Sequence, residues 1–445
     1  MIDSNLIATA LQIPCIVSAT MQQAMEQWED LYVNQGEWQK NRVRPLRIPS
    51  ILTKELKRLI LTEFTASVNN IQTDIDFQAM IPLLRRKLDF GLAVGGLLFK
   101  PYWSASGVHV DIVTQNQYLP VNFTNDTCDA IACPQSLTIG KYFYTRIELH
   151  KYNPQAMTHM ITNRCFRSRN STDLGTECSL AEVGAWADIL PEKTFERVQK
   201  PLFAVFQMPD ANNIDITSPL GISAYADAID FIRDADIHWE RILWELESSE
   251  RAIDASEDLF RYRDGKPVLP KGRERMFRSY EKTPDGGSIF NTFSPEIRDV
   301  SYFNAFNQIL RRIENAVGFS YGTLSEVSDV EKTAEEIKSS KQRSFARIQD
   351  IQANLQTALE QLVYGMQYYH NYYENSNQQA KLTCTFGDGV LEDTDKEFNR
   401  RLQLVTSGNL KPEKLLAWYF GCSEEEALKY MPAMSNDGGL FDGDD

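Results

Sequence analysis

Two helical patterns joined by a short polar segment, over residues 299–372, constrain the fold of this chain more than any other feature. In the first pattern, residues 299–318, apolar side chains recur at alternating intervals of three and four and mark one helix face. They are Phe303, Phe306, Leu310, Ile313 and Val317. Gly318 follows, where a glycine commonly ends a helix in the left-handed conformation. The sequence therefore predicts a helix that stops at Gly318.

The second pattern runs from about Lys332 to Tyr372 with no proline, and its first glycine is Gly365. Its apolar stripe consists of Phe345, Ile348, Ile351, Leu355, Leu359, Leu362, Met366 and Tyr369. A helix of that length spans roughly 60 Å. One compact core does not need so long a helix, so we expect it to cross an assembly.

The segment between the two patterns, residues 319–331, is polar and rich in small residues. Two interpretations of it are open. It is either a simple turn of a helical hairpin or, if several copies form a ring, a loop that projects into a central channel.

The rest of the chain predicts an α+β protein. Helical patterns cover residues 21–33, 49–67, 74–90, 222–255, 393–407, 411–419 and 424–430. Alternating β-type patterns cover residues 107–113, 137–150, 159–164 and 381–386. Residues 90–99 predict a buried helix end that leads into a strand, and residues 261–295 predict a small β-containing lobe.

The charge of the chain is strongly acidic, with a formal net charge of −15. Such a chain is not expected to condense onto DNA or an anionic membrane through its overall field. Residues 261–282 are the exception, with eight basic and three acidic side chains. This segment is either a solvated surface with salt bridges between subunits or a docking face for an acidic partner.

Motifs of catalysis are scarce. We find no phosphate-binding loop, no zinc-protease or calcium-loop motif and no nucleophile elbow, so we do not expect an enzyme or a cofactor. The seven cysteines include no Cys-x-x-Cys pair and show no ligand spacing with the five histidines. We therefore expect reduced thiols and no metal site.

Several segments, in order along the chain, resemble phage portal proteins of the type found in long-tailed phages of Gram-positive bacteria. They are Met25–Tyr32 with Trp38, Gly95–Tyr102, Tyr118–Val121, Ser218–Asp230, Gly318–Ser325, Lys332–Ile337 and Asp393–Glu426. Together they extend from near the N-terminus to about residue 432.

The resemblance implies a portal-type fold in which copies of the chain surround a DNA channel. It implies a wing over residues 1–217, stem helices over 218–256 and 298–318, and a clip over 257–297 between them. It also implies a tunnel loop over 319–331, a long wing helix over 332–379, and a helical crown with an acidic tail over 380–445.

The resemblance also implies a function, which is a conduit at one capsid vertex for DNA packaging by a separate motor, DNA retention, tail attachment and DNA ejection. The implied partners are further copies of the chain in a ring, twelvefold in virions, and double-stranded DNA bound without sequence specificity. The other implied partners are the terminase motor, the major capsid and scaffolding proteins and a head–tail adaptor. No membrane is implied. The implied location is the virion, and the host cytoplasm during assembly. A head–tail adaptor or minor capsid protein without a DNA channel is the alternative.

Two sets of site residues follow from the resemblance. The expected tunnel-loop set is Ser320, Tyr321, Thr323, Ser325, Glu326, Ser328, Asp329 and Lys332. The expected clip docking set is Arg261, Arg263, Lys266, Lys271, Arg273, Arg275 and Arg278. DNA carries about one charge per 1.7 Å of helix axis, so a mostly polar or acidic loop would let it slide rather than bind it.

Overall fold

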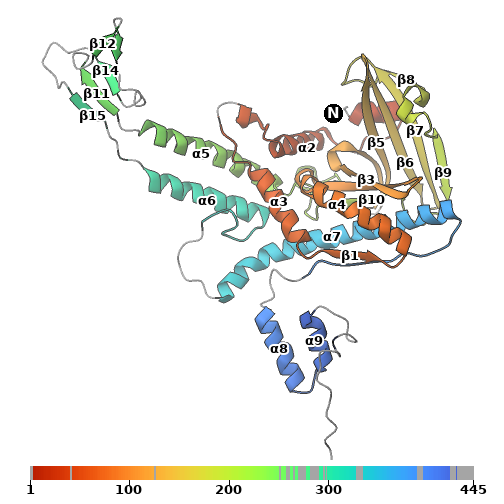
Figure 1. Ribbon diagram of the computed structural model, residues 1–445. Coiled ribbons are helices and arrows are strands. Elements are labelled where there is room, and N and C mark those ends of the chain that lie inside the picture. Colours follow the sequence, from red (N-terminus) through yellow and green to blue (C-terminus); the bar gives the residue numbers. More distant parts are fainter. Residues whose placement is uncertain are drawn as a thin grey trace, which may run out of the picture. The chain divides into compact units, whose positions relative to one another are not determined.

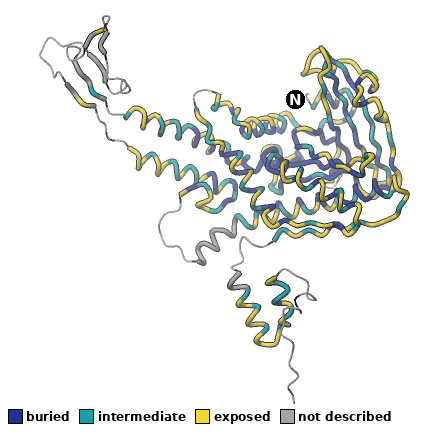
Figure 2. Tube along the Cα trace, viewed as in Figure 1, coloured by how far each residue is buried: buried dark blue, intermediate teal, exposed yellow. Residues whose placement is uncertain are grey.

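The computed structural model of the protein describes residues 4–40, 43–124, 127–249, 252–256, 261–263, 266–268, 277–280, 290–293, 296, 298–326, 334–387, 394–420 and 427. The chain divides into two compact units, Met1–Phe386 (unit 1) and Gly387–Asp445 (unit 2). Figure 1 shows their helices and strands, and Figure 2 shows which residues are buried. Long helices are combined with mostly antiparallel sheets, which confirms the predicted α+β class.

The N-terminal part of unit 1 is helical, as predicted. Its helices are α1 (Ser4–Leu11), α2 (Ala19–Tyr32), α3 (Ile48–Leu61) and α4 (Ile71–Val94). The Oδ1 atom of Asn70 accepts the amide hydrogen of Thr73 and fixes the start of α4. Gly95, with φ of +97°, ends α4 and turns the chain directly into strand β2 (Gly96–Ser104). Residues 90–99 are therefore a helix end followed by a strand, as expected.

The main strands of unit 1 form two sheets. One has the order β10-β2-β3, with β3 at Gly107–Thr114 and β10 at Ala204–Gln207. The other has the order β4-β5-β6-β7-β8, with β9 paired to β7. Its bounds are β4 Leu119–Thr124, β5 Thr127–Ile139, β6 Tyr142–Asn153, β7 Thr158–Ser168, β8 Thr176–Cys178 and β9 Glu192–Glu196.

The single strand predicted over residues 137–150 is wrong. The structure has the end of β5 and most of β6 there, joined by a tight hairpin in which Gly140 has φ of +62°. The strand predicted over residues 381–386 is confirmed as β16 (Leu382–Thr385). It pairs antiparallel with β1 (Thr65–Val68) and so lies in unit 1.

Helix α7 (Ala334–Glu374) supplies much of the core of unit 1. Its bounds lie within two residues of the predicted ones, and Figure 2 shows its buried face. The predicted stripe is buried at Ile348, Ile351, Leu355, Leu359, Leu362, Met366 and Tyr369. This face packs on β2 and β10 and against α3. Despite the length of α7, no helix in the described part of the chain is both long and apolar enough to cross a bilayer.

Helices α5 (Ile229–Ser248) and α6 (Asp299–Val317) lie side by side as a hairpin (Figure 1). The bounds of α6 confirm the prediction, with Gly318 at φ of +78°. Helix α5 is shorter than the predicted 222–255. Its first residues are held outside the helix because the amide of Ala224 donates to Leu92 O and the hydroxyl of Tyr225 donates to Trp28 O.

The segment between α5 and α6 contains the predicted β-containing lobe. Its strands are β11 (Ala252–Ser256), β12 (Arg261–Arg263), β13 (Lys266–Val268), β14 (Phe277–Tyr280) and β15 (Phe290–Phe293). Strands β14-β11-β15 form one sheet, and β12 pairs with β13 as a hairpin.

Unit 2 contains the helices α8 (Thr394–Thr406) and α9 (Pro412–Phe420), close to the predicted ranges. Their aromatic side chains join them, since the rings of Phe398 and Tyr419 lie 5.3 Å apart. The guanidinium of Arg401 lies 4.5 Å from the centre of the Trp418 ring. The helix predicted over residues 424–430 lies outside the described residues, apart from Ala427.

Asp236 ties helix α5 to the N-terminal segment. The side chain is fully buried, and its Oδ2 atom accepts hydrogen bonds of 2.9 Å from both Trp38 Nε1 and Gln39 Nε2. Its Oδ1 atom accepts the amide of Leu46 at 2.8 Å. A buried carboxylate is costly unless such donors replace water. Trp38 therefore helps to position helix α5.

A second buried network lies in the six-stranded sheet, around His150 and His159, which are 1% and 0% exposed. The amide of Leu202 donates to His159 Nδ1, so Nε2 of that ring carries the proton. It donates to His150 Nδ1 at 3.0 Å, and His150 Nε2 donates to Glu148 Oε1 at 2.7 Å. Both rings are neutral in this arrangement.

The charges around this network are paired. Lys100 Nζ and Arg146 Nη2 lie 3.0 and 3.1 Å from Glu148 Oε2. Burial opposes the charge of Glu148, but the hydrogen bond from His150 and the two cations hold its pKa far below the ordinary value. Burial lowers the pKa of His150 and lowers that of His159 well below the ordinary 6.5. Both histidines therefore resist protonation in the folded protein.

We expect the free energy of unfolding to fall as the pH drops below about 6.5, because the unfolded histidines then gain protons that the folded ones do not. Each buried ring contributes a slope of up to ~1.4 kcal/mol per pH unit. Urea unfolding between about pH 5 and 7 measures the slope. His159→Gln should reduce it, and the exposed His109→Gln is the control. Equal slopes in His159→Gln and the unchanged protein would contradict the assignment.

Candidate functional site

The loop that follows α6 starts from a fixed point. Gly318 adopts a left-handed conformation, and a Cβ there would lie 2.9 Å from Arg347 Cδ. The amide of Phe319 donates to Glu314 O at 2.7 Å, and the Phe319 ring is buried. Arg347 of α7 donates to Val317 O, the last residue of α6, and to Asp210 Oδ2 at 2.7 Å. The end of α6 is therefore capped by a cation from α7.

Glu314 organises the loop itself. Its side chain is fully buried, and its Oε1 atom accepts the amides of Gly322, Leu324 and Ser325 at 3.2, 2.6 and 2.8 Å. Its Oε2 atom accepts the hydroxyl of Ser325 at 2.8 Å. All four donors are neutral groups of the loop. A buried carboxylate depends on such donors. Residues 322–325 are therefore held in the backbone conformation that points these donors at the Glu314 carboxylate.

Further hydrogen bonds hold the two ends of the described loop. The hydroxyl oxygens of Ser320 and Ser344 lie 2.8 Å apart and connect the loop to α7. At the other end, the amide of Glu326 donates to Asn307 Oδ1 at 2.9 Å. The loop is thus attached to both α6 and α7.

The predicted tunnel-loop residues separate into two groups. Tyr321, Thr323 and Glu326 are exposed, and the Tyr321 side chain has a relative exposure of 55%. Ser325 is only 6% exposed, because its hydroxyl bonds to Glu314, so it positions the loop rather than facing outward. Ser320 is half-buried. Ser328, Asp329 and Lys332 lie outside the described residues.

The predicted clip residues are only partly described. Arg261 and Arg263 lie in β12, Lys266 in β13 and Arg278 in β14. Arg263 is exposed and stands opposite Lys266 in the β12-β13 hairpin, so two cationic residues are register partners there. Lys271, Arg273 and Arg275 lie outside the described residues.

An ion pair joins α5 and α6 next to the lobe. Arg298 Nε and Nη2 donate to the two carboxylate oxygens of Glu245 at 3.0 and 2.7 Å. These hydrogen bonds lower the pKa of Glu245. The same guanidinium lies 5.4 Å from the centre of the Tyr302 ring. A bidentate ion pair of this kind fixes the relative orientation of the two side chains as well as their distance. It therefore helps to set the directions in which α5 and α6 leave the lobe.

Sequence reasoning missed the residues that hold this site together, which are Asp236, Glu245, Arg298, Glu314 and Arg347. For one of them, Glu314, the sequence contained a signal of its role. Glu314 lies beside Ile313 on the apolar stripe of its helix and four residues before Gly318. An acidic residue on a buried face next to a helix end needs a set of donors, and the following loop is the nearest source.

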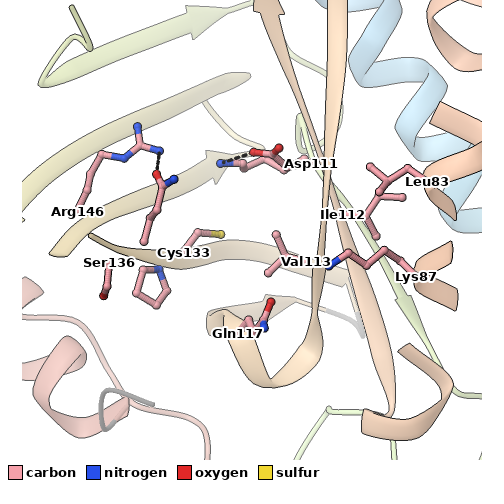
Figure 3. Close-up of a pocket in the computed structure, with 12 residues that line it drawn as sticks. Leu83, Lys87, Asp111, Ile112, Val113, Gln117, Cys133, Ser136 and Arg146 are labelled. Atoms are coloured by element: carbon pink, nitrogen blue, oxygen red, sulfur yellow. Dashed lines mark hydrogen bonds and ion pairs between the residues drawn. The ribbon is translucent and has the colours of Figure 1, made fainter. Parts of the chain in front are cut away.

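A cavity of about 590 Å³ lies elsewhere, between α4 and the sheets (Figure 3). Its lining includes Lys87, Lys100, Asp111 and Arg146. Lys100 Nζ lies 3.6 Å from Asp111 Oδ2, and Arg146 Nη2 donates to Gln135 Oε1 at 3.0 Å, as the dashed lines in Figure 3 show. These pairs connect β2 to β3 and β5 to β6, so they stabilise the pairing of neighbouring strands.

Replacing Glu314 tests its role in the loop. In Glu314→Ala the amides of Gly322, Leu324 and Ser325 lose their acceptor, and we expect their hydrogen exchange to accelerate by about 10–100-fold. Glu314→Gln retains one carbonyl acceptor and should give a smaller change. Arg312→Ala, an exposed site on the same helix, is the control. Unchanged exchange in Glu314→Ala would mean that the loop is held by other contacts.

Comparison with known proteins connects this geometry to a family. The family model described as "Phage portal protein, SPP1 Gp6-like" matches residues 139–437, more than half of the chain. The match includes α5, α6, the loop and α7, and it begins after the N-terminal segments that resemble the family in sequence. Comparison with individually curated proteins gave no match. The chain belongs to the SPP1 Gp6-like family of phage portal proteins, which are structural components of the phage particle.

Proposed function

We propose that copies of this protein close into a ring, twelve in the virion, that forms a DNA conduit at one vertex of the capsid. A separate terminase motor packages DNA through the ring, which then retains the DNA, carries the tail through a head–tail adaptor and lets the DNA out. The family membership supports this role. The observation that carries it is the α5–α6 hairpin with a loop fixed to its inner end by Glu314.

The parts of the chain take the following roles in this proposal. Residues 1–217 and α7 form the wing, α5 and α6 form the stem, and the β-containing lobe of residues 257–297 forms the clip. Residues 319–331 form the tunnel loop, and the C-terminal helices form the crown, toward the capsid interior. The basic residues of the clip dock the motor and later the adaptor, and the wing contacts the capsid and scaffolding proteins.

Exposed apolar side chains on the stem support assembly into a ring. Trp244 of α5 is 62% exposed, and Val300 and Phe303 of α6 are 68% and 45% exposed. Apolar side chains of this size that face water on a helical hairpin are typical of surfaces that bind another protein. In the proposed ring, the stem of the next copy covers them.

The exposed side chains of the loop suit contact with a moving polyanion. Tyr321 and Thr323 are neutral, and Glu326 is acidic. A ring of cations at this position would hold DNA phosphates electrostatically, and that attraction increases with each added charge. A neutral and acidic ring instead leaves the duplex free to slide, while the net charge of −15 per chain repels it from the walls.

Electron microscopy of the purified full-length chain tests the ring. We expect closed rings with a central hole wide enough for duplex DNA. Trp244→Glu should shift the population toward monomers, because it adds a charge to the covered stem face. Ile216→Glu, which is 90% exposed and lies outside the stem, should leave the rings intact. Monomers or solid particles from the unchanged protein would favour an adaptor or minor capsid role without a channel.

Replacing the exposed side chains of the loop tests the DNA path. In the triple variant Tyr321→Ala, Thr323→Ala and Glu326→Ala, the donors to Glu314 remain, so rings should still form. We expect the yield of packaged or retained DNA to fall at least about tenfold, as sensitivity of the DNA to nuclease would measure. Deletion of residues 321–329 should have a stronger effect. Full packaging by both variants would remove the loop from the proposed mechanism.

A further inference from the structure

Two cysteines face each other at the edge of the six-stranded sheet. Cys165 of β7 is the direct register partner of Cys178 of β8, in antiparallel pairing. Their Sγ atoms lie 3.4 Å apart. Figure 1 shows β8 beside β7 at the end of this sheet. The pair was not predictable from the sequence, because twelve residues separate the two cysteines along the chain.

The backbone at this position has the spacing that a disulfide needs. Facing residues of an antiparallel pair have Cα atoms about 4.5–5.5 Å apart. Disulfides span Cα separations of about 4.4–6.8 Å, so a bond requires only side-chain rotation. Cys128 and Cys133, by contrast, lie five residues apart on the single strand β5, so their Cα atoms are too far apart along the extended chain for a disulfide.

The surroundings keep the two sulfurs together. Cys165 is 1% exposed and packs in a small cluster with Tyr144, Val183 and Trp186. Cys178 is half-exposed, so a reagent in solution can reach its sulfur. An ion pair lies next to the two cysteines, between the residues that precede them, Arg164 and Glu177. Arg164 Nη2 is 2.6 Å from Glu177 Oε2.

The edge itself is weakly held. Strand β8 has only three residues, Thr176–Cys178, and the neighbouring ion pairs of Arg164 with Glu177 and of Arg167 with Glu182 are exposed to solvent. Exposed pairs of this kind contribute little to stability. A covalent link at Cys178 would therefore stabilise this edge more than these exposed ion pairs do.

We propose that Cys165 and Cys178 form a thiol–disulfide site, which is reduced inside the cell and closes to a disulfide when the protein meets a small-molecule disulfide such as oxidised glutathione. This goes beyond the conduit role and does not require it. The proposed function adds only a reason for the change, since a virion leaves the reducing cytoplasm for an oxidising environment.

The chemistry proceeds by two exchanges. The Cys178 thiol loses its proton, and its thiolate attacks one sulfur of oxidised glutathione, releasing one glutathione thiol and leaving a mixed disulfide. The Cys165 thiolate then attacks Cys178 Sγ, forms the Cys165–Cys178 bond and releases the second glutathione thiol. The two protons lost by the cysteines are carried by the two released thiols, so the protein is oxidised and glutathione reduced.

The reaction should be slow at neutral pH and faster at alkaline pH. Burial raises the pKa of Cys165 to about 12 and also raises that of Cys178. The thiolate is the reacting form, so its small population limits both exchanges. This slowness suits a link that forms after assembly rather than during it.

The test uses the purified full-length chain with excess oxidised glutathione at mildly alkaline pH. After the remaining thiols are alkylated, peptide mass spectrometry should find the peptides of Cys165 and Cys178 joined within one chain. The oxidised protein should also melt a few degrees higher than the reduced protein. Cys178→Ser should abolish the linked peptide and the shift, whereas Cys128→Ser should change neither.

Two results would overturn the proposal. One is full alkylation of both cysteines, or separate glutathione adducts on each, after prolonged oxidation. The other is a linked peptide found only between two chains on a non-reducing gel. Both readouts come from the unchanged protein, so they stand even if a variant folds poorly. They are also independent of ring formation, so failure here leaves the proposed conduit untouched.

Discussion

Buried carboxylates that accept hydrogen bonds from neutral groups hold both helices of the α5–α6 hairpin to their surroundings. Glu314 of α6 gathers three amides and a hydroxyl from residues 322–325, and Asp236 of α5 gathers donors from residues 38–46. A carboxylate removed from water is stable only where such donors replace it. Residues 322–325 and residues 38–46 are therefore each stabilised in the backbone conformation that points their donors at the carboxylate. The position of the loop and the attachment of helix α5 both depend on this constraint.

Helix α7 connects this constraint to the core. Its buried face packs on the β10-β2-β3 sheet, while Arg347, near its N-terminal end, bonds to Val317 O at the end of α6 and to Asp210. Ser344, one turn earlier, lies 2.8 Å from the Ser320 hydroxyl in the loop. Moving the loop would therefore break contacts to α6 and α7 together. Because close-packed interiors deform little, the loop is as firmly positioned as the sheet on which α7 packs.

Periodicity in the sequence predicted the helices of the site well, and tertiary contacts explain where it failed. The stripes and Gly318 located α6 and α7, since local pattern and packing agree there. Helix α5 was predicted too long because distant backbone bonds from Ala224 and Tyr225 override the helical pattern at its start. The exposed and buried faces of the loop were not predictable, because the burial of Ser325 depends on its bond to Glu314. The charge pattern of the clip was visible in the sequence, but most of its side chains lie outside the described residues.

The way the loop is anchored separates its support from its contact surface. Glu314 binds mainly backbone amides, which every residue except proline provides, so this support does not depend on the exposed Tyr321 side chain. The Thr323 hydroxyl, by contrast, donates to Ser320 O and adds to the support of the loop. Tyr321 can therefore change without releasing the loop, whereas Glu314 cannot. The proposed conduit would need such a division, because a wall that meets DNA has to be weakly attractive while its position stays fixed. Charge at the exposed positions can then be adjusted to the polyanion without a cost to the fold.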